Sequence, residues 1–426
     1  MGKVTKNTPD DRLAAQKNVE SPEVLADNPT SDTIVLGEHA QSMFVKAGTV
    51  GVVALAASFL LGWTGDTKQF QHSYLIGYMF VLQIVLGGVF WVTLQHLVGA
   101  KWSVVMRRIG ELLAMNATLM AILALPIVLP IFFGNASLYP WADVDRMHAD
   151  HLLHHKLPYL NITFFAIRFV VYFGFWALVS QFFFANSLRQ DASGDPRLLK
   201  RMAKFAPVFM IVFALTLTFM SIDFLMSLTP EWFSTIFGVV YFAGCVISLH
   251  CFLVLSVVWL QSKGRLVKSV SVEHFHDLGK MMFGFTVFWT YVSFSQFMLI
   301  WYANIPEETE WFKIRFEGDW KLVSTWLLIG NFVIPFFGLL SRHVKRNKKA
   351  LAFWAAYLLF CRFVEMYWLV KPKISHGHLS FHVLDLTCVV GLLGIVIAST
   401  AYQARKVKLL PTRDPRLAQS LAFENF

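Results

Sequence analysis

Ten apolar stretches, each about as long as a membrane-crossing helix, dominate this 426-residue chain. A helix needs about 20 apolar residues to cross the hydrocarbon core, where every backbone N–H and C=O must be satisfied internally. The pattern therefore predicts an all-α integral membrane protein. The predicted spans cover 43–63, 74–98, 104–132, 160–187, 205–228, 232–260, 280–302, 321–341, 350–369 and 383–404.

Positive charge alternates between the segments that join these spans. The two tails and the even-numbered connections carry 25 Lys and Arg residues, counting Arg107 and Arg108, whereas the odd-numbered connections carry 7. Basic segments stay in the cytoplasm, so both termini are predicted to be cytoplasmic. The chain then divides into a cytoplasmic arm (1–42), a membrane domain (43–404) and a cytoplasmic tail (405–426).

Composition changes this picture little. The net charge of +10 follows from the basic cytoplasmic segments, so it does not indicate a nucleic-acid partner. Four cysteines lie inside predicted spans without a C-x-x-C pair, which is typical of buried packing thiols. The sequence contains no iron–sulfur or haem-attachment motif.

Ionisable residues within the spans are the candidates for function, because a charge at membrane depth is costly. Arg362 and Glu365, and likewise His382 and Asp385, are three residues apart, so each pair shares a helix face. Each pair could join helices or carry protons. The candidates for a proton pathway are Asp223, Arg168, Glu365, Arg362, Asp385, His382, Glu111, His96 and His250.

Asp223 has no charged neighbour on its own predicted helix. A lone buried carboxylate must find a cation or hold a proton. Arg168 lies at a similar predicted depth on the preceding span and is the first candidate partner. Asp223 is therefore either half of a structural ion pair or a group that exchanges protons with the outer side.

Histidines offer two further hypotheses. His151 and His155 have the spacing of metal ligands on a helix, but Leu152 and Leu153 stand where a zinc protease would carry its glutamate. We interpret 148–155 as a surface loop or partner contact. His96 and His250 lie well inside spans, and one b-type haem between them is a second, less favoured, hypothesis.

The turn after Asp223 carries a family resemblance. The segment DFLMSLTPEWFSTIFGVVYFAG (223–244) includes a predicted tight turn at 228–231. It resembles the signature of the integral membrane subunits of alternative complex III, the quinol:cytochrome c oxidoreductases related to NrfD and polysulfide-reductase anchors. Supporting stretches are LYPW (138–141), FFAIRF (164–169) and YVSFSQF (291–297).

The resemblance implies a fold, partners and a function. Ten spans and a long arm look more like the second, F-type, quinone-binding subunit, with spans 2–5 and 6–9 forming two four-helix bundles and spans 1 and 10 flanking them. The implied partners are a homologous NrfD-like membrane subunit, a periplasmic iron–sulfur subunit, c-type cytochrome subunits and a terminal oxidase. The implied ligands are quinol or quinone and membrane lipids, with no covalently bound cofactor. The implied location is the bacterial inner membrane.

Two other functions fit the same residues. Ten spans with buried charges also suit a secondary transporter, although no pair of Gly- or Pro-interrupted spans stands out in corresponding halves of the sequence. A purely structural anchor for the sister subunit is the third hypothesis. The prediction we develop is a membrane subunit that supports quinol oxidation and transmembrane proton transfer.

Overall fold

The computed structural model describes residues 34–375 and 377–425. The first 33 residues of the predicted arm lie outside the described part of the chain. Within it, all named elements are helices, and a single isolated bridge joins Val35 to Lys408. The prediction of an all-α protein is confirmed.

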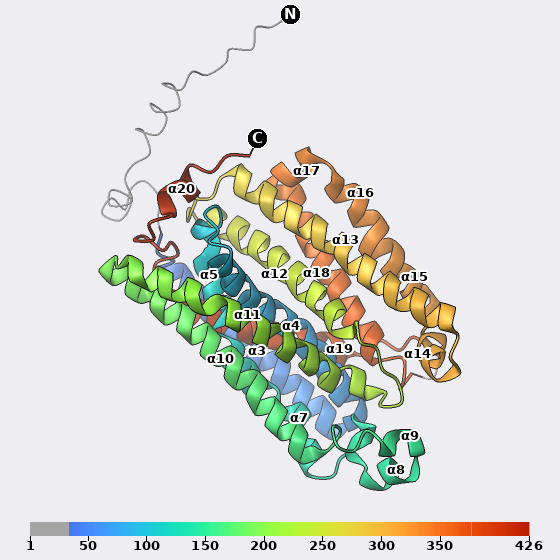
Figure 1. The fold of residues 1–426 in the computed structure, drawn as a ribbon. Coiled ribbons are helices and arrows are strands. Elements are labelled where there is room, and N and C mark those ends of the chain that lie inside the picture. Colours follow the sequence, from blue (N-terminus) through green and yellow to red (C-terminus); the bar gives the residue numbers. More distant parts are fainter. Residues whose placement is uncertain (1–33, 376, 426) are drawn as a thin grey trace, which may run out of the picture.

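Ten helical segments are long and apolar enough to cross a membrane, as predicted (Figure 1). They are α3 (Glu38–Thr64), α4 (Thr67–Leu97), α5 to α7 (Val104–Ala114, Ala117–Leu123, Leu125–Phe132), α10 (Ile162–Ser193), α11 (Pro196–Phe224), α12 (Phe237–Ser262), α13 (Val272–Ala303), α15 and α16 (Trp320–Leu328, Ile334–Leu340), α18 (Lys348–Val370) and α19 (Val383–Ala404). Several begin at a polar cap: the carboxylate of Asp66, for example, accepts the backbone N–H groups of Lys68 and Gln69.

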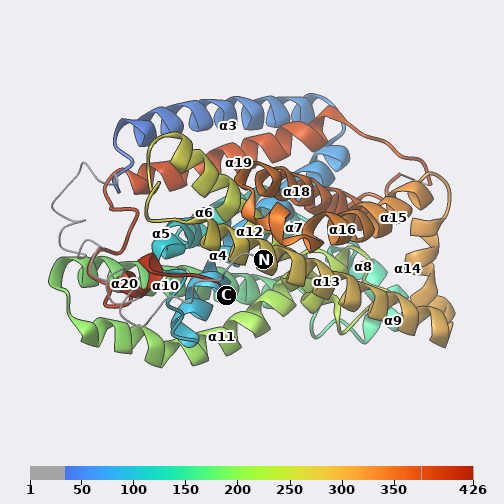
Figure 2. The same cartoon turned by 90° about the horizontal axis from the view of Figure 1, so that it is seen from above.

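The helices form two bundles side by side. The first contains α4, α5 to α7, α10 and α11, and the second contains α12, α13, α15–α16 and α18. Helix α4 lies at the centre, buried along its spanning length, and packs on both α11 and α12. Helices α3 and α19 lie together along one edge (Figure 2). Gly51 makes this contact close, because a Cβ there would lie 2.8 Å from the backbone nitrogen of Ile395.

The ends of the helices define two faces. The terminal face carries the described chain ends together with short helix α17 (Arg342–Arg346) and α20 (Leu417–Leu421). The distal face, at the lower end of Figure 1, carries α8 (Val144–Ala149), α9 (His151–His154) and α14 (Pro306–Phe316).

Two spans are interrupted. The third is divided into α5, α6 and α7, and two prolines, Pro126 and Pro130, lie in α7. Proline supplies no backbone N–H to the helix. The eighth contains a π-helical turn at Ile329–Val333, where the buried Asn331 side chain makes no hydrogen bond to the described residues. A span of this kind is locally widened.

Several predicted boundaries differ from the structure. Helices α4, α11 and α13 begin at Thr67, Pro196 and Val272, ahead of the predicted starts at 74, 205 and 280. The predicted tight turn at 228–231 is wrong, because α12 begins at Phe237 and not at 232. The indole of Trp232 stacks on Trp311 with ring centroids 4.3 Å apart, and Glu231 accepts a 2.9 Å ion pair from Arg146, so tertiary contacts hold the segment outside the helix. Helix α3 begins at Glu38, within the predicted arm 1–42.

Candidate functional site

The two residues proposed to pair across adjacent spans meet in the first bundle. Arg168 in α10 donates from Nε and Nη2 to the two carboxylate oxygens of Asp223 in α11, at 2.8 and 2.9 Å. The Tyr172 hydroxyl donates a third bond at 2.8 Å, and Asp223 is fully buried. Bidentate bonds of this kind fix the relative orientation of the two side chains. The arrangement fits the structural-pair hypothesis for Asp223.

Arg168 is further held on its other side. Its Nη1 donates to the Tyr159 carbonyl at 2.8 Å, and its guanidinium lies 3.9 Å from the Tyr159 ring centroid and 4.5 Å from that of Phe164. The Arg168 guanidinium is therefore stabilised by a hydrogen-bond acceptor and by two aromatic ring faces in addition to Asp223.

Glu365 and Arg362 form the second predicted pair, in α18. Arg362 Nη1 donates to Glu365 Oε2 at 2.8 Å, and the Trp289 indole N–H of α13 donates to Oε1 at 2.6 Å. The guanidinium lies 4.5 Å from the Trp289 ring centroid. Two nitrogens of Arg362, Nε and Nη2, have no hydrogen-bond partner among the described residues. Two N–H donor groups of Arg362 inside the second bundle are therefore free to bind a further acceptor.

A cavity of about 380 Å³ reaches Glu365. We call it the Glu365 cavity. Its walls are mostly aromatic and aliphatic, and its polar groups include Glu365, Gln296 and Ser293. The side-chain oxygens of Gln296 and Ser293 have no partner within the described chain. The cavity is also lined by Phe294 and Leu328, which are 56% and 57% exposed on the bundle surface, so it opens sideways toward the surface that lipid would cover.

Asp385 is paired with a cation that sequence reasoning missed. Its Oδ1 lies 3.1 Å from the ammonium of Lys371 and accepts from the Ser73 hydroxyl at 2.5 Å. Both charged groups are fully buried. Burial lowers the pKa of Lys371, and the carboxylate of Asp385 opposes that shift. Lys371 was counted as a loop residue, and only its position just beyond α18 hints at burial.

His382 and Asp385 lie together at the start of α19, and the proton role of His382 stays a prediction. Its imidazole caps α19 by accepting the Leu384 N–H, while Asp385 accepts the His382 backbone N–H at 2.9 Å. The two residues form a reciprocal capping box and not a side-chain ion pair. The His382 side chain is exposed on the distal face.

Glu111 belongs to a larger ion-pair network near the terminal face. Arg107 bridges Glu111 at 3.2 Å and Asp414 of the C-terminal tail at 2.7 Å, and Arg108 pairs with Asp191. Burial alone would raise the pKa of Asp414, but the guanidinium groups of Arg107 and Arg416 hold it well below its usual range. Asp191 and Asp414 were absent from the predicted set, because no local spacing links either one to α5.

His96 and His250, the two histidines predicted to lie well inside spans, form no bond with these ion pairs in the described part of the chain. His96 stacks on Phe183 with centroids 5.0 Å apart, and neither ring nitrogen has a partner among the described residues. His250 Nδ1 bonds the Val246 carbonyl at 2.7 Å, and its ring packs edge-on against Trp91. Among the described residues no ring contact or hydrogen bond joins His96 to His250, and the haem hypothesis stays a prediction.

The loop histidines gather without forming a ligand set. The rings of His151 and His155 lie 4.9 Å apart, and those of His148 and His154 lie 5.5 Å apart. Within residues 34–375 and 377–425, no three His, Cys, Asp or Glu side chains are placed to hold a metal ion. The four cysteines are free and buried, as predicted.

The predicted site residues thus fall into separate groups at different depths. The described hydrogen bonds join Arg168 to Asp223, Arg362 to Glu365, and Lys371 to Asp385, but no chain of bonds connects one pair to the next. Any proton transfer between them would need water or side-chain movement.

These features define a polytopic, all-α membrane protein with paired charges in its interior. No protein-family model matches the sequence, and no curated protein matches it.

Proposed function

We propose that this chain is a membrane subunit of a quinol:electron-acceptor oxidoreductase of the alternative complex III type. In this proposal it lies in the bacterial inner membrane with both termini in the cytoplasm. It assembles with an NrfD-like sister subunit, a periplasmic iron–sulfur subunit, c-type cytochromes and a downstream terminal oxidase. It supports quinol oxidation and moves protons between the two faces.

The observation that carries this proposal is the Glu365 cavity. Its aromatic walls suit a flat ring with an isoprenoid tail, and its opening lies on the lipid-facing surface, where such a molecule arrives. Oxidation of a quinol to a quinone releases two electrons and two protons. In this proposal Glu365 accepts one hydroxyl proton and water accepts the other, while Arg362, paired with Glu365, stabilises the resulting charge redistribution. The electrons pass to redox centres of the partner subunits.

A tagged preparation tests the complex itself. The chain purified in mild detergent should carry haem c and iron–sulfur absorbance in constant ratio to it. A chain that purifies without either absorbance would overturn the assignment to a redox complex.

A second variant tests the role of Glu365. In Glu365→Gln the carbonyl oxygen can still accept the Trp289 N–H, but the proton acceptor is lost. We expect quinol turnover to fall roughly 100-fold, the scale of lost general-base catalysis, with unchanged haem c content. The matched control is Glu310→Gln, whose side chain is 59% exposed in α14 and pairs with Lys313. Full turnover in Glu365→Gln would leave a structural anchor as the better function.

The transporter hypothesis gains limited support. Interrupted spans do occur in both bundles, as α5 to α7 and as α15–α16. They are the second span of one bundle and the third of the other, whereas inverted or parallel repeats place broken helices at corresponding positions.

A further inference from the structure

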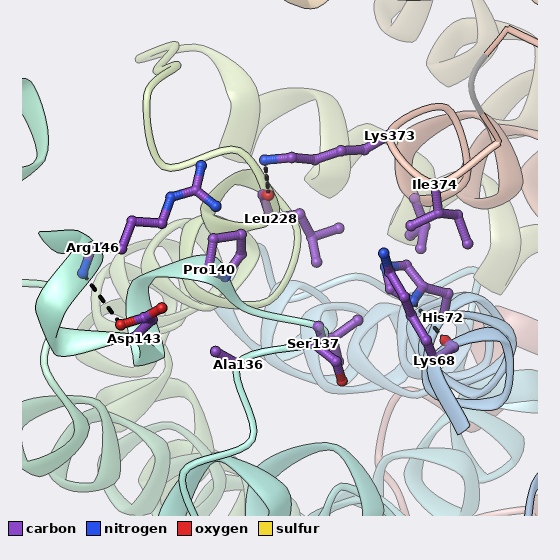
Figure 3. A pocket seen from close by; sticks show the side chains of 12 residues that line it. Lys68, His72, Ala136, Ser137, Pro140, Asp143, Arg146, Leu228, Lys373 and Ile374 are labelled. Atoms are coloured by element: carbon purple, nitrogen blue, oxygen red, sulfur yellow. Dashed lines mark hydrogen bonds between the residues drawn. The ribbon is translucent and has the colours of Figure 1, made fainter. Parts of the chain in front are cut away.

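A second cavity lies on the distal face, where the start of α4 meets the segments after α7, α11 and α18. Its volume is about 280 Å³. We call it the distal cavity (Figure 3). One side is formed by Lys68 and His72 of α4, and Arg146 of α8 stands across from them, as Figure 3 shows. Lys373 reaches in from the segment after α18.

The convergence of these cations is unusual for this chain. Only 7 Lys and Arg residues lie in the connections of the distal face. Three of them, from three different connections, line this one cavity: Lys68, Arg146 and Lys373. Basic residues are scarce on this side, so three exposed ones around a single cavity form a local concentration of positive charge.

The carboxylates in reach are already occupied. Asp143 lines the cavity but caps α8, accepting the Arg146 backbone N–H at 3.2 Å. Glu231 is shared, with Arg146 at 2.9 Å and Lys373 at 3.8 Å. Within the described residues, the Lys68 ammonium takes part in no hydrogen bond or ion pair.

Neighbouring charges add to the excess. The Lys156 ammonium bonds two backbone carbonyls, those of Pro230 at 2.5 Å and Glu231 at 3.3 Å, and no described carboxylate. Burial lowers the pKa of Lys373; Glu231 opposes the shift, whereas Arg146 and Arg315 add to it. An added anion would relieve this repulsion.

We propose that the distal cavity binds an oxyanion the size of a phosphate group, held by Lys68, Arg146 and Lys373. The volume is several times the ~30 Å³ occupied by one water molecule, so it accommodates such a group with part of its hydration. Two sources share this chemistry: free inorganic phosphate and the headgroup of an anionic phospholipid. The site is independent of the Glu365 cavity and of the proposed redox function.

Calorimetric titration and thermal unfolding test the site in the full-length protein. One arm titrates inorganic phosphate into protein in lipid-free detergent at pH 7.5, with sodium chloride of equal ionic strength as the reference. The other arm compares nanodiscs of phosphatidylglycerol with nanodiscs of phosphatidylcholine. We expect saturable binding and a rise of about 2–5 °C in the unfolding midpoint in one arm. A response to phosphate identifies the free ion, and a response confined to phosphatidylglycerol identifies the headgroup.

Substitutions localise the effect. Lys68→Gln should fold like the parent, because the Lys68 ammonium makes no bond in the described structure, and it should weaken binding at least fivefold. Lys68→Arg should restore most of it. The control is Lys313→Gln, a distal lysine whose side chain is 61% exposed and that pairs only with Glu310.

Two outcomes would overturn the proposal. One is the absence of any midpoint shift or binding heat beyond the chloride reference in both arms. The other is a response in Lys68→Gln equal to that of the parent and of Lys313→Gln, which would show that the anion acts elsewhere.

Discussion

Replacing Asp223 with asparagine tests whether the buried pair with Arg168 holds the first bundle together. Asn keeps the shape but can accept only one of the two guanidinium bonds, and its NH₂ group would face a donor. Breaking a buried pair by removing one partner costs roughly 3–5 kcal/mol. The Tyr159 carbonyl and ring still hold the guanidinium, so we expect the lower end of that range. A loss of about 3 kcal/mol lowers the folded-to-unfolded ratio roughly 150-fold.

The chain carries its own reporter for this measurement. All four cysteines are free and buried, so a thiol-reactive fluorescent dye responds only as the protein unfolds. Glu310→Gln is the matched control, since its exposed pair should contribute less than ~1 kcal/mol. The double variant Asp223→Asn, Arg168→Gln should recover part of the loss, because two neutral amides can bond each other.

The outcomes separate the two hypotheses for Asp223. A stability equal to that of the Glu310→Gln control would refute the structural role. Normal stability together with lost proton-coupled turnover would assign Asp223 to proton transfer instead.

Three further predictions concern topology, pH and packing. Externally added thiol reagent should label Glu307→Cys but not Arg342→Cys in intact cells, because the charge split places the distal face outside; the reverse labelling would invert the orientation. Because the folded protein lowers the pKa of Asp414, the ionised carboxylate stabilises the fold fully above the unfolded-state pKa of about 3.9, and this stabilisation is lost as the pH falls below that value. Asp414→Asn should therefore lower the unfolding midpoint at pH 7 and make the midpoint less dependent on acid pH. Parallel pH profiles of the variant and the parent would contradict this. Gly51→Ala should destabilise the α3–α19 contact by about 1–3 kcal/mol, whereas Gly48→Ala, whose Cβ would meet Ala398 at an ordinary 3.5 Å, should be neutral in the same dye assay.

The positions of the helices could be predicted from the sequence, because a membrane span is a continuous apolar stretch that needs no knowledge of long-range contacts. Length and hydropathy placed all ten, with ends that mostly fall within a few residues of the structure. The largest differences are at the starts of α4, α11 and α13, where the helix extends beyond the apolar stretch into polar residues. The start of α12 differs for another reason, because a tertiary contact decides the backbone there. Trp232 is apolar and reads as part of a span, yet it stacks on Trp311 from a separate connection. Hydropathy cannot distinguish burial in protein from burial in lipid.

The same holds for the charged residues: pairs set by local spacing could be predicted, whereas pairs made by long-range contacts could not. Arg362 and Glu365 were predictable because three residues on a helix fix their separation. Arg168 and Asp223 were predictable because depth can be counted along adjacent spans. The cation of Asp385 could not be found from local spacing, since Lys371 directly follows α18 and pairs with the first turn of α19 across the chain.

The basic residues in the connections of the distal face are of two kinds, buried and exposed. A lysine in a polar connection is expected to be solvated, and a single solvated charge costs the protein little. Here the connections fold inward, so Lys371 is fully buried against Asp385 and Arg315 is buried with three backbone carbonyls as its acceptors. Lys68, Arg146 and Lys373 remain exposed and line the distal cavity, where Glu231 is the one described carboxylate paired with both Arg146 and Lys373. The basic residues of the distal face therefore divide into buried cations, whose partners the protein supplies, and exposed cations around the distal cavity, where one carboxylate serves two of them and Lys68 has none within the described chain, so an anion would be bound by the second group.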